Sequence, residues 1–175
     1  MEVTQPGAHI DHMLRQTRMH NMQLSTMADM KANLLLTISS LVLGLSLTHL
    51  RNSIENFAFI ILCASSLGTI SLAIYATMPK AGPMGLLKKK QYRRPKYFTL
   101  LFFGDYANLT YEEYEKEMEV TMNSPSLTYE VQVRELYNMG VYLAKHKYQK
   151  LRLAYLVFLS GIISAVVVYF FQYLI

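Results

Sequence analysis

One lysine stands where an apolar side chain is expected, and a charge in that position could do ionic chemistry. Lys147 falls on the apolar stripe of a predicted helix, seven residues beyond Gly140 and four before Leu151. A buried ammonium group needs a counter-charge, because desolvation otherwise disfavours its charged form. Asp29, Asp105 or an anionic ligand could supply that charge, whereas snorkelling toward a lipid head group would avoid burial. The pattern leaves these alternatives open.

Aromatic and basic residues of the polar segments form a second group that could do chemistry. Bases stack on aromatic rings while Lys and Arg neutralise phosphates, so this combination suits a nucleotide. The same rings also suit a small hydrophobic core, and the pattern alone favours the core. The aromatic residues in question are Tyr97, Phe102, Phe103, Tyr106, Tyr129, Tyr137, Tyr142 and Tyr148.

Motifs of enzymes and of metal sites are missing from the sequence. It has no Gly-rich phosphate loop, no nucleophile elbow and no zinc-protease motif, and its one cysteine is Cys63. His9 and His12 lack a third ligand at a suitable spacing, so we expect no metal site. We therefore expect a protein that is not an enzyme and that needs no cofactor.

A polar stripe inside the first apolar segment has the spacing of one helix face. Small and hydroxyl residues on such a face let helices pack closely, and they can also line a water-filled path between several chains. Turning an asparagine amide toward lipid would cost a few kcal/mol. The pattern leaves packing and pore lining open for this stripe, which consists of Asn33, Thr37, Ser40, Gly44 and Thr48.

Three segments without a charged residue determine the class of the protein. They are residues 32–50, 56–78 and 153–175 of a 175-residue chain that is 52% hydrophobic and 17% charged. A helix of roughly 20 apolar residues crosses the hydrocarbon core of a bilayer. We therefore predict an all-α membrane protein with three transmembrane helices, and this composition excludes an ordinary soluble protein. The polar first 31 residues predict no cleaved signal peptide.

The lysine and arginine positions predict the orientation of the spans. Sixteen of the 17 lie in residues 1–31 and 79–152, and only Arg51 lies in the turn between the first two spans. Because basic residues favour the cytoplasmic side, the N-terminus should be cytoplasmic and the C-terminus should lie outside. The basic run from Lys88 to Lys96 predicts contact with anionic membrane lipids rather than with a specific nucleic acid sequence.

Long helices should extend the first and third spans into the cytoplasm. Residues 10–31 contain neither Pro nor Gly, and no proline follows Pro125. We predict one helix from about residue 9 to Leu50 and another from about Leu127 to Ile175. An apolar stripe on the second should pack against the first, and it comprises Val133, Leu136, Gly140, Leu143 and Leu151. A polar stripe on the first is interpreted as a solvated face, and it comprises Asp11, Arg15, Arg18, Met22, Ser25 and Asp29.

A small helical cap should complete the cytoplasmic part. Thr110-x-x-Glu113 is a capping-box pattern that predicts an acidic helix from Tyr111 to about Thr121. The aromatic stretch at residues 97–106 should pack into the core of this cap. The resulting regions are a stalk at 1–31, a transmembrane hairpin at 32–78, a cytoplasmic regulatory region at 79–150 and a third span at 151–175.

Four motifs, in this order along the chain, resemble those of bacterial Pycsar-type transmembrane effectors. The first is the A-D-x-K-A-x-x-L-L pattern of Ala28–Leu36, at the start of the first span. The others are LFFGDY at 101–106, LTYEEY at 109–114 and KHKYQKLRLAY at 145–155. Together they cover most of residues 24–160.

This resemblance implies an antiphage effector of the bacterial inner membrane, encoded beside a nucleotidyltransferase or a cyclase. Such effectors respond to a nucleotide signal by compromising the membrane. Related Hailong effectors are homomeric ion channels that a short deoxyadenylate oligomer holds shut. The resemblance leaves open whether the ligand is a cyclic pyrimidine nucleotide or an oligodeoxyadenylate, and whether it opens or closes the channel.

On this basis we expect a homo-oligomeric ion channel, with a tetramer as the expected assembly, that a nucleotide gates at the cytoplasmic region. The expected phosphate-binding residues are Arg15, Arg18, Arg134 and Lys147, and Phe103 or Tyr106 should stack on a base. Asp29 and Lys31 match the family motif and are assigned to coupling between ligand and gate. Asn33, Thr37, Ser40, Gly44 and Thr48 should line the pore.

Two other functions stay open at this point. The first is a non-conducting membrane anchor or assembly factor that binds a soluble partner through residues 79–150. The second, with less support, is a membrane enzyme that acts on lipids. Conductance of the purified protein separates the channel from the anchor.

Overall fold

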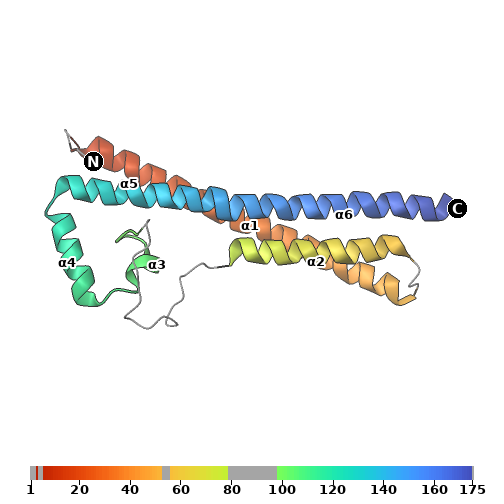
Figure 1. Ribbon diagram of the computed structural model, residues 1–175. Helices are drawn as coiled ribbons and strands as arrows, with labels where there is room; N and C mark the ends of the chain where they lie inside the picture. The colour runs from red at the N-terminus through yellow and green to blue at the C-terminus, as the bar shows by residue number, and fades with distance from the viewer. Residues whose placement is uncertain (1–2, 4–5, 53–55, 79–97, 175) are drawn as a thin grey trace. The chain divides into compact units, whose positions relative to one another are not determined.

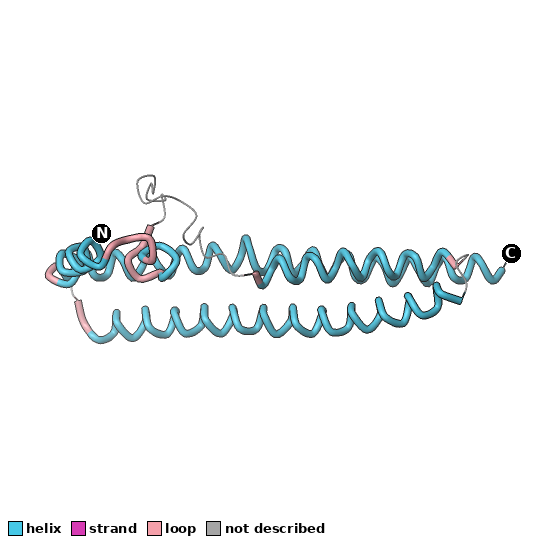
Figure 2. Tube along the Cα trace, turned by 90° about the horizontal axis from the view of Figure 1, so that it is seen from below, coloured by secondary structure: helices cyan, strands magenta, loops and turns pink. Residues whose placement is uncertain are grey.

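The computed structural model describes residues 3, 6–52, 56–78 and 98–174. Every regular element in these ranges is helical, and none of them is a strand (Figures 1 and 2). The prediction of an all-α chain is confirmed for this part of the protein. The elements are α1 (Ala8–Asn52), α2 (Phe57–Thr77), α3 (Phe103–Tyr106), α4 (Tyr111–Met122), α5 (Pro125–Tyr142), the π-helix η2 (Leu143–Tyr148) and α6 (Gln149–Leu174).

Three helical stretches are long and apolar enough to cross a membrane. They are Ala8–Arg51, Phe57–Thr77 and Pro125–Gln172. The prediction of three membrane-spanning helices is confirmed in this sense of length and composition. α1 also confirms the long first helix, and α5, η2 and α6 follow one another where a single long helix was predicted. The predicted lipid-binding run from Lys88 to Lys96 lies outside the described residues.

The chain divides into two compact units, each of which is described by itself. The polar unit comprises residues 1–23 and 79–142, and the apolar unit comprises residues 24–78 and 143–175. The four regions predicted from the sequence have other boundaries, and they stay a prediction.

In the polar unit, two helix starts follow from local sequence. The Thr110 hydroxyl accepts a hydrogen bond from the Glu113 N–H (3.2 Å), and the Glu113 carboxylate accepts one from the Thr110 N–H (2.9 Å). This reciprocal pair is the predicted capping box of α4. Pro125 occupies the first position of α5, where an N–H would have no helical partner in any case. The predicted start of α4 is confirmed, and α5 begins two residues before the predicted start at about Leu127.

The core of the polar unit is small. Leu14 of α1 packs with Tyr129 and Leu136 of α5, and Ile10 adds to this cluster. Thr99 and Leu100 are also buried. The predicted core role of the neighbouring aromatic stretch is wrong for three residues, because 43%, 55% and 36% of the surfaces of Phe102, Phe103 and Tyr106 are exposed. Phe103 and Tyr106 lie in the short α3, which covers little surface, and Phe102 directly precedes it.

The apolar unit is built on close contacts between small side chains. α2 and α6 lie side by side (Figure 1). A Cβ added at Gly161 of α6 would overlap the side chain of Ser65 of α2, so the two backbones approach closely at this point. A second cluster joins α1 to α6 and consists of Ala28, Ala32, Leu35, Leu151 and Ala154. The alanines permit this approach, and Leu35 and Leu151 fill the remaining space.

The predicted apolar stripe on the last long helix is buried at three of its five positions. Leu136 is buried in the polar unit, and Leu143 and Leu151 are buried in the apolar unit. Gly140 is half-buried. The prediction is wrong for Val133, of which 38% is exposed, because the small polar-unit core is formed one turn away at Tyr129 and Leu136.

Candidate functional site

Lys147 forms a buried ionic contact in the apolar unit. It is the one charged side chain classed as buried among the described residues, with 9% of its surface exposed. Its Nζ lies 2.7 and 2.8 Å from the two carboxylate oxygens of Asp29 and 2.8 Å from the Ser25 hydroxyl. The three donors of the ammonium group therefore have three acceptors. The predicted counter-charge is Asp29, whereas Asp105 accepts a hydrogen bond from the Thr99 N–H (2.9 Å).

The local backbone explains how Lys147 reaches this position. Ser25 and Asp29 are four residues apart on α1, so their side chains share one face of the helix. Lys147 lies within η2, where i→i+5 bonding gives a wider turn than an α-helix has. Two tyrosines flank this contact. The hydroxyl of Tyr148 donates to the carbonyl of Leu24 (3.0 Å), and that of Tyr155 donates to the carbonyl of Lys31 (3.2 Å).

The ion pair of Lys147 with Asp29 stabilises the packing of α1 against η2. Removing one partner of a fully buried ion pair costs about 3–5 kcal/mol, because the other charge stays buried without compensation. The Asp29 side chain is 43% exposed, so we expect a smaller cost of roughly 1–3 kcal/mol here. The cost is high enough to hold the segment of α1 from Leu24 to Lys31 against η2. It is also low enough for a competing anion to replace Asp29.

Two of the predicted phosphate-binding arginines already have a carboxylate partner in the polar unit. Arg18 pairs with Glu135 (2.6 Å), and Arg134 pairs with Glu130 four residues earlier (2.8 Å). The arginine side chains are 37% and 51% exposed. Arg15 is also exposed. Pairs of this kind contribute about 0–1 kcal/mol, so a phosphate group could take the place of either carboxylate. Lys147 belongs to the other unit.

The predicted base-stacking rings are accessible, and their surroundings are acidic. The ring of Phe103 lies 5.0 Å from that of Phe102, and the ring of Tyr106 lies 5.1 Å from that of Tyr114. The sequence that follows is rich in glutamate, and its carboxylates would repel a phosphate group. These rings therefore suit a base better than a phosphate. The glutamates in question are Glu112, Glu113, Glu115, Glu117 and Glu119 of α4.

The predicted pore-lining face of α1 is not covered by the other helices of the apolar unit. All five residues are exposed, namely Asn33, Thr37, Ser40, Gly44 and Thr48. The hydroxyls of Thr37 and Thr48 donate to the carbonyls of Asn33 and Gly44, each at 2.9 Å. The buried face of the same helix carries Ala28, Ala32, Leu35, Ser39 and Ser46. α1 thus packs within its chain through one side and presents its polar stripe on another.

The interpretation of the other polar stripe on α1 as a solvated face is wrong for Arg18, Ser25 and Asp29. Asp11 accepts a hydrogen bond from the Tyr129 hydroxyl (2.9 Å), and this bond raises the pKa of the Tyr129 phenol. Arg18 pairs with Glu135, and Ser25 and Asp29 bind Lys147. Asp11, Arg15 and Met22 of this stripe are exposed.

Sequence reasoning missed Ser25 as an acceptor, the two tyrosine hydroxyls and the π-helix. The apolar stripe carries no signal for the π-helix, because residues eight apart, such as Leu143 and Leu151, share one face of an ordinary α-helix. Ser25 and Asp29 of α1 are four residues apart, the same interval as between Leu143 and Lys147 on the other long helix. Their polar side chains nevertheless suggested contact with solvent.

In a comparison with known protein families, the Pycsar effector protein domain matches residues 12–174, which is nearly the whole chain. No curated protein and no solved structure matches the sequence.

Proposed function

Because this chain belongs to the Pycsar effector domain family, we propose that it is an antiphage membrane effector that forms a homo-oligomeric ion channel. In this proposal the channel lies in the bacterial inner membrane with the N-terminus cytoplasmic and the C-terminus periplasmic. A nucleotide made by a neighbouring nucleotidyltransferase or cyclase gates it. The current through the open channel depolarises the infected cell.

The observation that carries the proposal is the uncovered polar face of α1. Three helices per chain are too few to enclose a pore, so water must lie between chains. Asn33 and Ser40 are exposed on this face, although a lipid environment would leave the Asn33 amide without partners. Water between several copies of α1 would hydrate both side chains. We therefore assign pore lining to Asn33, Thr37, Ser40, Gly44 and Thr48.

The nucleotide would bind in the cytoplasmic region. Arg15, Arg18 and Arg134 would contact its phosphates, and Phe103 or Tyr106 would stack on a base. The exposed pair of Arg134 with Glu130 supports this assignment, because a phosphate can replace its carboxylate at little cost. The pair of Arg18 with Glu135 is partly buried, so exchange there would cost more. Both a cyclic pyrimidine nucleotide and an oligodeoxyadenylate carry the necessary groups.

Asp29 and Lys31 would couple the ligand to the gate. Asp29 is the counter-ion of Lys147, so an anion that competes for Lys147 would release α1 from η2. A ligand shifts a gate only by its difference in affinity for the two states, and a hundredfold shift takes about 2.7 kcal/mol. This value lies within the roughly 1–3 kcal/mol expected for the Lys147 contact. Lys147 therefore has two proposed roles, which are binding of phosphate and coupling.

Conductance in planar bilayers tests the proposal. The purified full-length chain should carry an ion current that changes when a cyclic pyrimidine nucleotide or an oligodeoxyadenylate is added. In a Cys63→Ser background, Ser40→Cys should make that current sensitive to block by a charged methanethiosulfonate. Ser71→Cys is the matched control, because Ser71 is an exposed serine of α2 outside the proposed lining. Absence of current with every nucleotide would favour the non-conducting anchor, and equal block in both variants would remove the stripe from the pore.

A further inference from the structure

An apolar groove lies where the three long helices of the apolar unit meet. Its volume is about 490 Å³, which falls within the ~300–1,000 Å³ range of ligand pockets. The Tyr169 hydroxyl is the one polar side-chain group among its lining residues. We call it the three-helix groove, and its lining includes Val42 of α1, Ala58 and Phe59 of α2, and Ala165, Tyr169 and Phe170 of α6.

Small side chains create the three-helix groove. Ala58 and Ala165 form its floor, and each has only 3% of its surface exposed. Ala165 lies four residues beyond Gly161, the position at which α6 closely approaches Ser65 of α2. The two helices are therefore in close contact at Gly161, and about one turn further along α6 the alanines leave room between them. Phe170, also in the lining, is 62% exposed, so the groove opens to the outside of the helix bundle.

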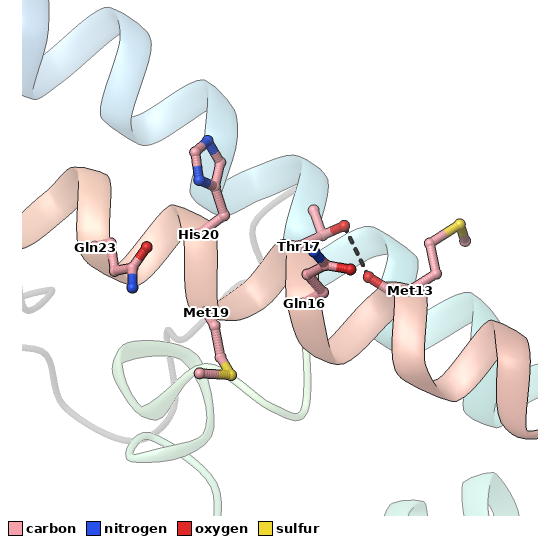
Figure 3. Close-up of a pocket in the computed structure, with 6 residues that line it drawn as sticks. All are labelled: Met13, Gln16, Thr17, Met19, His20 and Gln23. Carbon is pink, nitrogen blue, oxygen red and sulfur yellow. Dashed lines mark hydrogen bonds between the residues drawn. The ribbon is translucent and has the colours of Figure 1, made fainter.

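A hollow of similar volume, about 470 Å³, lies on the polar unit (Figure 3). All of its lining residues belong to α1, so it is the surface of a single helix. Among the described residues no second helix lines this hollow, and a ligand there would be held from one side. Walls from three helices therefore favour the three-helix groove as a binding site. The lining residues of the hollow are Met13, Gln16, Thr17, Met19, His20 and Gln23.

The surroundings of the three-helix groove determine what can fill it. The helices that form it are long and apolar enough to cross a membrane, so the groove faces hydrocarbon. An ordered water needs about two to four polar partners, and the single hydroxyl of the lining cannot supply them. An empty groove would lose the dispersion contacts of its walls. A lipid acyl chain is flexible and apolar, so it can fill this space.

A polar edge lies beside the three-helix groove at the end of α1. The ring of His49 stacks on that of Phe59, with 4.7 Å between the centroids and 12° between the planes. His49 and Val42 are seven residues apart, so they share a face of α1 and are separated by about 10 Å along its axis. The polar edge is therefore within reach of a molecule that lies in the groove.

The polar edge offers a hydrogen bond and a positive charge. The Nδ1 atom of His49 lies 3.0 Å from the Leu45 carbonyl oxygen, and a carbonyl only accepts, so this nitrogen carries the proton. The Nε2 atom can then accept from a hydroxyl group of a lipid head. Arg51 lies in the last turn of the same helix, and its charge attracts phosphate. An apolar interior with a cationic edge is the pattern that an anionic phospholipid requires.

We propose that the three-helix groove binds one anionic phospholipid, with an acyl chain between α1, α2 and α6 and the head group at His49 and Arg51. The lipid belongs to the leaflet in which α1 ends and α2 begins. Val42 is about half a turn of α1 away from both Ser40 and Gly44, so the groove and the proposed pore lining are on opposite sides of this helix. The site is separate from the proposed function and holds whether or not the protein conducts ions.

Fluorescence quenching tests whether an acyl chain occupies the three-helix groove. The sequence contains no tryptophan, so one introduced indole reports its own surroundings. Phe170→Trp places the indole in the groove. Phe171→Trp is the matched control, because the two phenylalanines are 62% and 63% exposed and Phe171 is outside the lining. In detergent micelles, phosphatidylglycerol with brominated acyl chains should quench Phe170→Trp at an about fivefold lower concentration than Phe171→Trp.

Two outcomes of this experiment would overturn the lipid site. Equal quenching of the two variants would show that both positions contact bulk lipid alone. Quenching confined to Phe171→Trp would show that a second copy of the chain covers the groove.

A larger side chain in the lining should exclude the lipid. In the Phe170→Trp background, Val166→Phe should raise the lipid concentration for half-quenching about fivefold, because Val166 lines the groove. Val167→Phe is the matched control, since the two valines are 50% and 47% exposed and Val167 is outside the lining. Both side chains are exposed, so neither change should disturb the packed interior. The same response in both variants would contradict binding in the groove.

Removal of the positive charge tests the head-group contact. In the Phe170→Trp background, Arg51→Gln should weaken quenching by brominated phosphatidylglycerol about fivefold. Arg152→Gln should leave it unchanged, because Arg152 is an exposed residue near the start of α6, away from the groove. Brominated diacylglycerol, which has no phosphate, should quench weakly and equally in both variants. An unchanged response to phosphatidylglycerol in Arg51→Gln would overturn the assignment of the head group.

Discussion

Within each of the two units, the helices are held together by a different kind of contact. In the polar unit, α1 and α5 meet through a small cluster around Leu14 and through side-chain pairs such as Arg18–Glu135 and Asp11–Tyr129. In the apolar unit, α2 and α6 lie side by side and approach closely at Ser65 and Gly161. The polar unit therefore depends on a few replaceable pairs, whereas the apolar unit depends on shape.

This difference indicates where a signal can act. Exposed ion pairs exchange partners at little cost, so in the proposed function a ligand would rearrange the polar unit by competing for arginines such as Arg134. Close-packed helices have few alternative arrangements. The contact between Lys147 and Asp29 differs from the close packing of the rest of the apolar unit. It is an ion pair, and its lysine lies in the π-helix η2. A change in that contact would transmit a signal to a unit that otherwise resists change.

The largest expected effect concerns Lys147. We expect Lys147→Ala to abolish the response to nucleotide while membrane insertion persists. Lys147→Met and Asp29→Asn should each lower the free energy of unfolding by roughly 1–3 kcal/mol, because each leaves one polar partner uncompensated. In the double variant Lys147→Met/Asp29→Leu the loss should be smaller than the sum of the two single losses. Unfolding in detergent measures the stability terms, and additive losses would show that the pair is not coupled. Normal gating in Lys147→Ala would remove this residue from the site.

Substitutions at two glycines of the apolar unit compare a closely packed position, Gly161, with an open one, Gly44. Gly161→Val should destabilise the chain by about 1–3 kcal/mol, because the added side chain would overlap Ser65. Gly44→Ala should have little effect on a single chain, since among the described residues no atom lies within 4 Å of the added Cβ. Thermal unfolding of both variants in dilute detergent measures the difference. Equal destabilisation would contradict the close approach of α2 and α6.

A substitution at Tyr129 tests the side-chain pairs that hold the polar unit together. Tyr129→Phe removes the hydrogen bond to the Asp11 carboxylate and should cost about 1–2 kcal/mol. Asp11 raises the pKa of the Tyr129 phenol above its ordinary value of 10.0, so the contribution is complete below pH 10 and is lost as the pH rises through the higher value in the folded state. Urea unfolding at pH 8 and at increasing alkaline pH measures it. A difference between wild type and variant that does not shrink at alkaline pH would contradict this account.

Arg134 should have the smallest effect on stability. Its pair with Glu130 is exposed and spans one helical turn, so Arg134→Ala should change the free energy of unfolding by about 0.5 kcal/mol or less. If Arg134 binds phosphate, the same variant should weaken the nucleotide response several-fold. Conductance measured against nucleotide concentration separates these effects, and Arg134→Lys should restore part of the response. An unchanged response in Arg134→Ala would exclude the residue from the ligand site.

The sequence predicts the helices well because their determinants are local. Each span lacks charge over 19 residues or more, and the α4 capping box needs only Thr110 and Glu113. The pairing of Lys147 with Asp29 was foreseen among several alternatives, because a charge on an apolar stripe requires a partner. A buried lysine requires a negatively charged partner, but this requirement does not tell whether the partner is Asp29 or Asp105.

Features that depend on distant residues were harder to predict. The polar stripe of α1 looks solvated because Tyr129, Glu135 and Lys147 lie more than 110 residues beyond the side chains they bind. The exposure of Phe103 and Tyr106 depends on how little surface the short α3 covers. Hydrophobicity alone predicted burial for both rings.

The π-helix η2 contains one residue more than an α-helical turn in its place would have. Upstream of η2, the buried Tyr129 and Leu136 are seven residues apart, and downstream of it Leu151, Ala154 and Ala165 again follow α-helical spacing. Deleting one exposed residue of η2, such as Ala144, would convert this turn to an α-helical one, so the residues of α6 would keep their rotational phase. A deletion within α6 before Gly161 would have no such reserve: it would turn the rest of the helix by about 100°, and Gly161 would point away from Ser65.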